Sequence, residues 1–331
     1  MARSGKQQMR GGVEIVLGDA LDLYDLWPSP VVIVSDGPYG LGLPGDLATP
    51  GELPGWYEPH IQAWSEHATP LTTLWFWSTE IGWATVHPVL AKHGWSYEKA
   101  CTWDKGIAHV AGNTNTKTLR RLPTVTELCV RYTKPPTFRA NGREMSTQEW
   151  LRHEWLRTGL LLADANRACG VRNAATRKYL TKCHRWYSPP TEVFERLVAY
   201  ANRHGSPAGR PFFSTDGEQP LTESQWSDMR AKFHCEPGLT NVWHGPSVRG
   251  SERIKNGTKA AHANQKPLSL IELTIRLCSD AGDIVWEPFG GLCTAAVASY
   301  RLGRQCYSAE IDPCVYDLAA RRLLDCGETA G

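Results

Sequence analysis

The stretch Val31-Val32-Ile33-Val34-Ser35-Asp36-Gly37-Pro38-Tyr39 decides the fold of this chain. It begins with four β-branched apolar residues, and the apolar run is too short for a helix. Such a run predicts a strand that is buried on both faces, as strands of parallel sheets are. The Asp-Gly-Pro that follows predicts an abrupt turn. We therefore expect a central strand over residues 31–35 with polar groups at its carboxyl end.

Strands and helical stretches alternate on both sides of this segment, which is typical of an α/β sheet. Further short apolar runs that predict strands cover residues 13–19, 74–77, 128–132, 283–286 and 305–309. Helical stretches are predicted at residues 20–26, 267–279 and 294–302. This alternation stops in the middle of the chain, where residues 134–240 are rich in Arg, Pro and turn residues. A sheet made from both ends of the chain, with an insertion in the middle, is the expected arrangement.

Composition narrows the class of protein. The chain has 331 residues, 41% of them hydrophobic, which is enough for one large domain and a smaller insert. The formal net charge is only +2, so any surface for nucleic acid must come from local clusters of Lys and Arg. The ten cysteines form no Cys-x-x-Cys pair, which favours buried free thiols in a reducing compartment over zinc or disulfides. No apolar run approaches membrane-span length, so we expect a cytoplasmic protein. We also expect no metal, because the cysteines and histidines lack the usual zinc spacing.

A candidate DNA-reading element lies within the insertion. Residues 160–180 resemble a helix-turn-helix, in which Arg172, Asn173, Arg177 and Lys178 would lie on the second helix. An ordinary pair of antiparallel helices explains the same pattern equally well. The element is therefore a hypothesis for DNA binding that needs a second line of support.

Two strand ends carry residues suited to chemistry. In an open α/β sheet, ligands bind beyond the carboxyl ends of the strands. There, Asp36, Pro38 and Tyr39 would provide a hydrogen-bond acceptor and an aromatic ring. A flipped nucleobase needs both, the acceptor for its amino hydrogens and the ring for stacking. Taken alone, the same residues are explained better by a plain turn.

The second strand end is Glu287-Pro288-Phe289-Gly290-Gly291, a strand-to-helix turn. Its glycines let a ligand approach the backbone, and a helix N-terminus is electropositive. About twenty residues later, Glu310 ends the next strand, at the offset typical of a ribose-binding acid. This pattern indicates an adenosine-containing ligand without separating a dinucleotide from S-adenosylmethionine.

Together, in this order, five segments resemble the β class of DNA amino-methyltransferases. They are Leu17-Gly18-Asp19, Asp36-Gly37-Pro38-Tyr39, Asn241-Val242-Trp243, HANQKP at 262–267 and EPFGGLCTA at 287–295. The resemblance covers residues 13–132 and 241–325. It implies a Rossmann-like methyltransferase sheet with helices on both faces and an inserted, mainly helical target-recognition region. The implied domains are a catalytic half at 13–133, target recognition at 134–240 and a cofactor-binding half at 241–325.

The resemblance also implies residue roles, with S-adenosylmethionine as cofactor. Asp36 and the backbone carbonyls of Gly37 and Pro38 would accept hydrogen bonds from the target amine, and Tyr39 would stack on the flipped base. Asp19 would lie near the cofactor adenine, Lys266 and Pro267 near its methionine end, Phe289 and Gly291 along its side, and Glu310 at its ribose. No metal and no covalent intermediate are implied.

Two positions depart from the family pattern. Gly37 stands where the family usually has proline, which we expect to loosen the loop. Cys293 stands where the second glycine of the cofactor turn is usual, which we expect to reshape the pocket slightly.

The resemblance implies double-stranded DNA as substrate and a cognate restriction endonuclease as a further partner, and it leaves open a monomer or a homodimer. Asp36 at the head of the catalytic motif favours adenine N6, with cytosine N4 as the alternative. A nicotinamide enzyme would fit the glycine turn and Glu310 but leaves Asp36–Tyr39 unexplained, and the Gly-x-Gly-x-x-Gly pattern is absent. An RNA methyltransferase and a non-enzymatic DNA-binding regulator are more distant alternatives.

Overall fold

The computed structural model describes residues 6–43, 46–110, 118–120, 122–140, 142–183, 186–207, 209–262 and 264–326. The chain divides into two compact units. Residues 1–134 and 231–331 form the first, here called the sheet unit, and residues 135–230 form the second, here called the helical unit. The sheet unit is thus made from both ends of the chain, and the helical unit from its middle.

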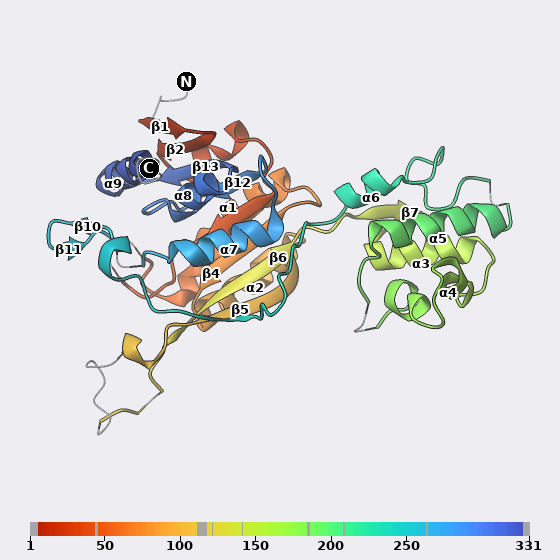
Figure 1. Cartoon of the computed structure of the whole chain (residues 1–331), viewed down its shortest axis with the longest axis horizontal. Helices are drawn as coiled ribbons and strands as arrows, with labels where there is room; N and C mark the ends of the chain where they lie inside the picture. Colours follow the sequence, from red (N-terminus) through yellow and green to blue (C-terminus); the bar gives the residue numbers. More distant parts are fainter. Residues whose placement is uncertain are drawn as a thin grey trace. The chain divides into compact units, whose positions relative to one another are not determined.

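The sheet unit is built on one large mixed sheet (Figure 1). Its order among the described residues is β1 (Gln7–Arg10), β2 (Val13–Leu17), β13 (Gln305–Glu310), β12 (Ile284–Glu287), β3 (Val32–Ser35), β4 (Thr73–Ser78), β6 (Thr126–Thr133), β5 (Ser96–Asp104) and β9 (Val242–His244). The five strands from β2 to β4 in this order are parallel, and β6 runs against both its neighbours. The C-terminal strands β12 and β13 therefore lie between the N-terminal strands β2 and β3.

Alternating side chains of β3 show why the sheet is covered on both faces. Val32 and Val34 join a core with α7 (Leu268–Cys278), α8 (Thr294–Arg301) and α9 (Pro313–Asp325). Ile33 joins the opposite core with α1 (Leu53–His67) and α2 (Glu80–Lys92). All three strand residues are at most 2% exposed, as the apolar run predicts. This architecture confirms the expected Rossmann-like α/β fold.

The helical unit has its own core. It contains β7 (Phe138–Ala140), β8 (Arg143–Met145), α3 (Thr147–Arg157), α4 (Asp164–Ala168), a π-helical turn (Thr176–Leu180), α5 (Thr191–His204) and α6 (Glu223–Asp228). Its stacked aromatic pairs include Phe194 on Trp226 at 4.0 Å between ring centroids and Phe138 on Trp150 at 4.1 Å. The insertion is therefore mainly helical, as expected, and it buries enough aromatic surface to be compact.

Some elements differ from the sequence prediction. Residues 20–26 form two 3₁₀ turns, Ala20–Asp22 and Tyr24–Leu26, instead of one helix, because Asp19 caps only a single short turn. Strands β1, β5 and β9 were not predicted, since they lie toward the sheet edges and are too polar or too short to show alternation. The smaller elements are β10 (Lys255–Asn256), β11 (Lys259–Ala260), and 3₁₀ turns at Pro50–Glu52, Ile107–His109 and Gly250–Glu252. Among the described helices, none has the length and hydrophobicity that crossing a membrane requires.

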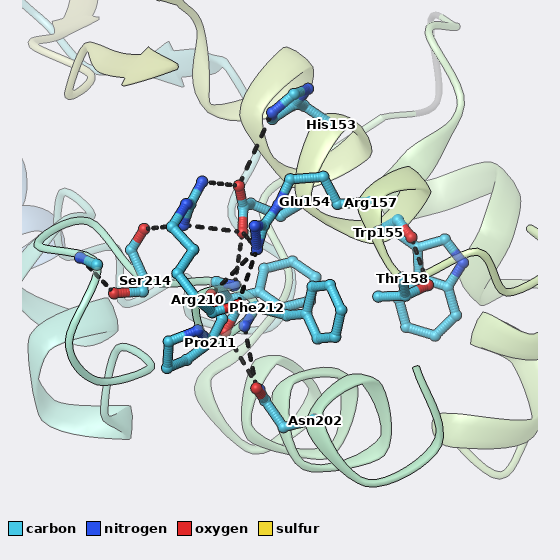
Figure 2. Close-up of polar contacts among 12 residues, drawn as sticks. His153, Glu154, Trp155, Arg157, Thr158, Asn202, Arg210, Pro211, Phe212 and Ser214 are labelled. Atoms are coloured by element: carbon cyan, nitrogen blue, oxygen red, sulfur yellow. Dashed lines mark hydrogen bonds and ion pairs between the residues drawn. The ribbon is translucent and has the colours of Figure 1, made fainter. Parts of the chain in front are cut away.

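A buried carboxylate holds the helical unit together (Figure 2). Glu154 on α3 is fully buried, and Arg210 Nη2 donates to its Oε1 at 2.7 Å. Arg157 Nη2 lies 3.3 Å from Oε2, and the backbone amide of Phe213 donates to the same oxygen at 2.8 Å. These bonds tie the segment around residues 210–214 to α3. A charge buried this way is tolerated only because its partners surround it.

Replacing Glu154 with Gln should destabilise the helical unit, because two arginines would lose the anion that compensates their burial. We expect the free energy of unfolding to fall by about 3 kcal/mol, measured by urea denaturation of the full chain with near-ultraviolet circular dichroism as probe. The control is Glu144→Gln, which breaks the exposed Arg139–Glu144 pair of the same unit and should change little. Equal losses in both variants would contradict the role of Glu154.

Candidate active site

Parallel pairing brings four acidic residues to one edge of the sheet. Asp19, Asp36, Glu287 and Glu310 stand at or just beyond the carboxyl ends of β2, β3, β12 and β13. The neighbouring strands β3 and β12 connect in opposite directions across the sheet. From β3 the chain passes through α1 on one face to β4, and from β12 it passes through α8 on the other face to β13. Crevices at such reversal points are where open α/β sheets bind ligands.

A cavity of about 1030 Å³ lies at this edge. Its walls include nine of the ten site residues predicted in the sheet unit, namely Asp19, Asp36, Gly37, Pro38, Tyr39, Lys266, Phe289, Gly291 and Glu310. The tenth, Pro267, is buried and caps the start of α7 without lining the cavity. Ala263, within the HANQKP segment, lies outside the described residues. The volume is at the upper end of the range for small-molecule sites, which suits a nucleoside-sized ligand together with a base.

At one end of the cavity, Glu310 is arranged as a hydrogen-bond acceptor. Its Oε2 accepts from the backbone amide of Gly291 at 2.6 Å and its Oε1 from that of Asp312 at 2.7 Å. Each oxygen keeps a lone pair for a ligand hydroxyl. Burial raises the pKa of Glu310 despite these bonds. Asp19, nearby in the cavity wall, caps the following turn through the amide of Leu21.

An aromatic wall adjoins Phe289. The His60 ring meets the Phe289 ring edge-on at 4.9 Å, and Trp56 lies 5.1 Å from Phe289. Trp64 donates to the Tyr24 hydroxyl, which leaves that hydroxyl's proton for His60 Nδ1 at 2.9 Å. Burial lowers the pKa of His60 to about 4, so the ring is neutral at physiological pH. His60 and Trp56 were missed in the sequence, where they look like ordinary residues of an amphipathic helix.

At the other end of the cavity, Asp36 is paired with Lys266. The Lys266 ammonium lies 2.7 Å from Asp36 Oδ1, 3.0 Å from Oδ2 and 2.9 Å from Glu127 Oε1. It also donates to the carbonyl of Asn264 at 3.3 Å. Lys266 is only 3% exposed, and all its protons have acceptors in the protein. The predicted contact of Lys266 with a cofactor stays a prediction, because in this structure the ammonium is committed to the two carboxylates.

Glu127 on β6 is a site residue that the sequence did not indicate. Its Oε1 accepts from the Tyr39 hydroxyl at 2.5 Å, and its Oε2 lies 2.8 Å from Lys105 Nζ. Burial raises the pKa of Glu127, but Lys266 and Lys105 outweigh burial and bring it down to about 2. Tyr39 itself is 5% exposed, and burial raises the pKa of its phenol. The predicted stacking of Tyr39 on a base is untested by this geometry.

Asp46 shapes the turn that follows β3. Its Oδ1 accepts from the backbone amides of Tyr39, Gly40 and Leu47, and its Oδ2 from that of Leu41, each at 2.8 Å. One carboxylate thus fixes the backbone directly after Asp36-Gly37-Pro38. No local sequence signal predicts this role, because the bonds depend on the path of the loop.

The two departures from the family pattern have structural reasons. A side chain at position 37 would place its Cβ 2.5 Å from the Tyr57 hydroxyl and 2.8 Å from Phe289. The turn is therefore packed tightly by these rings instead of being loosened. Cys293 adopts a left-handed backbone with φ of 50°, which glycine would favour, and it is fully buried away from the cavity wall. It does not reshape the pocket by direct contact.

Glu287 caps α8 from inside the protein. Its Oε1 accepts from the amide of Ala295 at 2.6 Å, and its Oε2 from the amide of Ala296 at 3.0 Å and the Ser308 hydroxyl at 2.9 Å. Burial raises its pKa to about 7 against these favourable bonds. Among the described residues there is no group of three or more His, Cys, Asp or Glu side chains arranged to hold a metal ion.

The predicted DNA-binding residues lie in the helical unit, and their placement corrects the helix-turn-helix prediction. α4 and the π-helical turn have five residues each, and Arg172 and Asn173 lie in bends between them. Thr176 begins the second element because its amide and hydroxyl bond to Asn166 and Leu162. Arg177 is exposed on the π-helical turn, and Lys178 lies over the Tyr187 ring.

Comparisons with known proteins agree with this architecture. A model of the family described as DNA methylase matches residues 31–321. Type II methyltransferase M.ScaI of Streptomyces caespitosus is 30% identical over 95 residues, 28% of this chain and 31% of that protein. The chain aligns with less than two fifths of the length of the curated relatives it matches.

Two solved structures share the fold. The M1.HpyAVI–SAM complex has a TM-score of 0.51 at 13% identity, over 93% of this chain and 98% of that chain. The cytosine-N4-specific PvuII DNA methyltransferase has a TM-score of 0.51 at 12% identity, over 98% and 95%.

The buried carboxyl of Glu287 should make stability depend on pH. Its pKa rises from 4.5 in the unfolded chain to about 7 in the folded one, so the folded chain holds the proton more tightly. Its contribution is fully present below pH 4.5 and is lost as the pH rises through 7, by about 3 kcal/mol. We expect urea unfolding from pH 5 to 8 to show this loss in the wild type and not in Glu287→Gln. Parallel stability curves would refute the raised pKa.

Proposed function

The chain belongs to the DNA methylase family, and on that premise we propose that it transfers a methyl group from S-adenosylmethionine to the exocyclic amine of a flipped base in double-stranded DNA. One observation carries the proposal: the turn at Asp36–Tyr39 and the acceptor Glu310 line the same cavity. The first suits a base with an amino group, and the second suits a ribose. A nicotinamide enzyme would need only the second.

The residues at the Glu310 end fit S-adenosylmethionine. Glu310 presents free lone pairs for ribose hydroxyls, Phe289 offers an aromatic side, and Gly291 leaves its backbone open to a ligand. The structurally similar M1.HpyAVI was solved with SAM. When bound, this cofactor supplies an electrophilic methyl group on a sulfonium.

The residues at the Asp36 end would hold the amine. Asp36 and the carbonyls of Gly37 and Pro38 are acceptors that would take the two N–H protons and orient the nitrogen lone pair. The Pro38 carbonyl already accepts from the Tyr57 hydroxyl at 3.2 Å, and its second lone pair is left for the substrate. Fixed orientation and preorganised charge, with no covalent intermediate, would supply the rate acceleration.

Adenine N6 is the favoured target, because Asp36 heads the motif, and cytosine N4 is the alternative. The fold by itself does not favour adenine, since the PvuII enzyme, cytosine-N4-specific by name, shares it. A restriction endonuclease of the same specificity and a cytoplasmic location are parts of the proposal that follow from the resemblance alone. Monomer and homodimer both stay open.

We assign target recognition to residues 134–240, between a catalytic half at 13–133 and a cofactor-binding half at 241–325. The helical unit carries 14 Lys and Arg against 10 Asp and Glu, although the whole chain has a net charge of only +2. Within it, residues 165–191 contain six Lys or Arg and no acid. Such local clustering of cations supports contact with DNA phosphates.

The test is nucleoside mass spectrometry of unmethylated DNA incubated with the protein and S-adenosylmethionine. We expect N6-methyladenine. Asp36→Ala should lower turnover by about 10³-fold and leave cofactor affinity unchanged in calorimetry, because Asp36 would contact the amine and not the cofactor.

Glu310→Ala is the matched variant for the other end of the cavity. It should weaken cofactor binding by about tenfold, because the ribose loses its acceptor. Detection of N4-methylcytosine would support DNA methylation as the activity and replace adenine by cytosine as the target base. Cofactor binding without any modified base in diverse DNA would reject the proposal, as would loss of cofactor affinity in Asp36→Ala.

Arg177→Ala should weaken binding to duplex DNA and reduce the slope of log affinity against log salt by about 0.9, the loss of one phosphate contact. The measurement is fluorescence anisotropy at several salt concentrations. Arg139→Ala is the control, because Arg139 is exposed in the same unit but lies outside residues 165–191 and pairs with Glu144. If both variants bind like the wild type, the basic segment is scaffold.

A further inference from the structure

Two carboxylates compete for one proton beside the proposed methyl-transfer site. The Tyr39 hydroxyl lies 2.9 Å from Asp36 Oδ1 and 2.5 Å from Glu127 Oε1. A phenol has a single proton to donate. The shorter contact is with Glu127, so that carboxylate is the better acceptor, and Asp36 is left with lone pairs that the tyrosine does not use.

Lys266 connects the same two carboxylates. It contacts both oxygens of Asp36 and one oxygen of Glu127, and its last proton goes to the carbonyl of Asn264. Lys105 lies at the outer oxygen of Glu127, where it also stands 4.8 Å from the Trp103 ring centroid. Two carboxylates and two ammonium groups thus balance in charge, although Glu127 is only 8% and Lys266 only 3% exposed.

We propose that Glu127 is a positioning residue for methyl transfer: it takes the Tyr39 proton and shares Lys266, so that Asp36 stays fixed with free lone pairs for the substrate amine. The inference rests on the proposed function. It gives Lys266 a task at Asp36, in place of the predicted contact with the methionine end of the cofactor. Glu127 acts through Tyr39 and Lys266, since it makes no direct contact with Asp36.

A purely structural ion cluster is the alternative. Buried ion pairs add little stability compared with apolar residues of the same volume, so stability alone is a weak reason for burying Glu127 and Lys266 next to the half-buried Asp36 and Lys105. The alternative predicts that substitutions of Glu127 change folding and leave the chemistry of the folded enzyme intact. The two readings therefore separate on the methyl-transfer rate of folded protein.

The experiment compares single-turnover methylation by wild type and Glu127→Gln at saturating S-adenosylmethionine and DNA. In the variant the amide no longer competes as an anion, so the Tyr39 proton turns to Asp36 and occupies the acceptor that the substrate needs. We expect the rate to fall about 30-fold, as for one charged hydrogen bond, with cofactor and DNA affinities nearly unchanged. Glu127→Asp should restore part of the rate, because it keeps the charge.

Two further readouts address the route of the effect. Glu127→Gln and Tyr39→Phe should be non-additive when combined, because without the phenol no proton is left to turn to Asp36. The pH profile should also shift. Burial lowers the pKa of Lys266, but Asp36 and Glu127 outweigh burial and raise it. Losing one carboxylate lowers that pKa, so the alkaline fall in rate should begin at lower pH in Glu127→Gln.

Lys232→Met is the control for removal of a lysine shared by two carboxylates elsewhere in the sheet unit, since the partly exposed Lys232 contacts Asp280 and Asp283 at 2.8 and 2.7 Å. It should leave the single-turnover rate unchanged. An active wild type with an equally active Glu127→Gln would overturn the role of Glu127 alone. Additive effects of the two substitutions would overturn the route through Tyr39. A wild type that binds cofactor and methylates no DNA would overturn the proposed function and this inference together.

Discussion

The pairing of β12 with β3 is the constraint on which the rest of the structure depends. It joins strands about 250 residues apart in register, Val285 beside Val32 and Trp286 beside Ile33. On one face, Trp286 is fully buried, stacks on Tyr24 at 5.3 Å and donates to the carbonyl of Pro28. A slip by one residue would turn these side chains to the wrong face. Because the pairing is parallel, it also brings Glu287 and Asp36 to the same edge, so the cavity exists only when the two ends of the chain have met.

The acidic residues at this edge are compensated in two different ways. Glu287 and Glu310 are held by backbone amides, which supply partial charges and leave the carboxyl pKa values raised by burial. Asp36 and Glu127 are held by full positive charges on Lys266 and Lys105. Backbone amides leave lone pairs suited to neutral hydroxyls, whereas an ion-paired carboxylate keeps a fixed anion in a buried place. Under the proposed function, the first end suits binding of the cofactor ribose and the second suits orientation of the reacting amine.

The sequence was sufficient for the parts of the fold and site that local patterns encode. The apolar runs at 31–35 and 283–286 identified central strands, and the turns after them identified Asp36 and Phe289. Residues whose roles depend on distant partners were not predictable. In the sequence, Glu127 resembles an ordinary exposed polar residue of a strand. It becomes part of the site only because Lys105, Tyr39 and Lys266 all contact it. The helix-turn-helix prediction failed in detail because the second element begins where the Thr176 amide donates to Asn166 Oδ1 and its hydroxyl donates to the Leu162 carbonyl.

The two departures from the family pattern are explained by packing of the neighbouring side chains. At position 37 the space for a ring is filled by Tyr57 and Phe289, and Tyr57 donates to the Pro38 carbonyl, so rigidity comes from tertiary contacts in place of a proline. At position 293 a non-glycine residue holds a left-handed backbone, and its thiol is packed 3.4 Å from the Ser308 hydroxyl, which is itself bonded to Glu287. A non-glycine residue keeps a strained left-handed backbone only where the surrounding contacts hold it in place. Both substitutions are thus tied to the residues that hold the cavity together, and neither removes an acceptor from its wall.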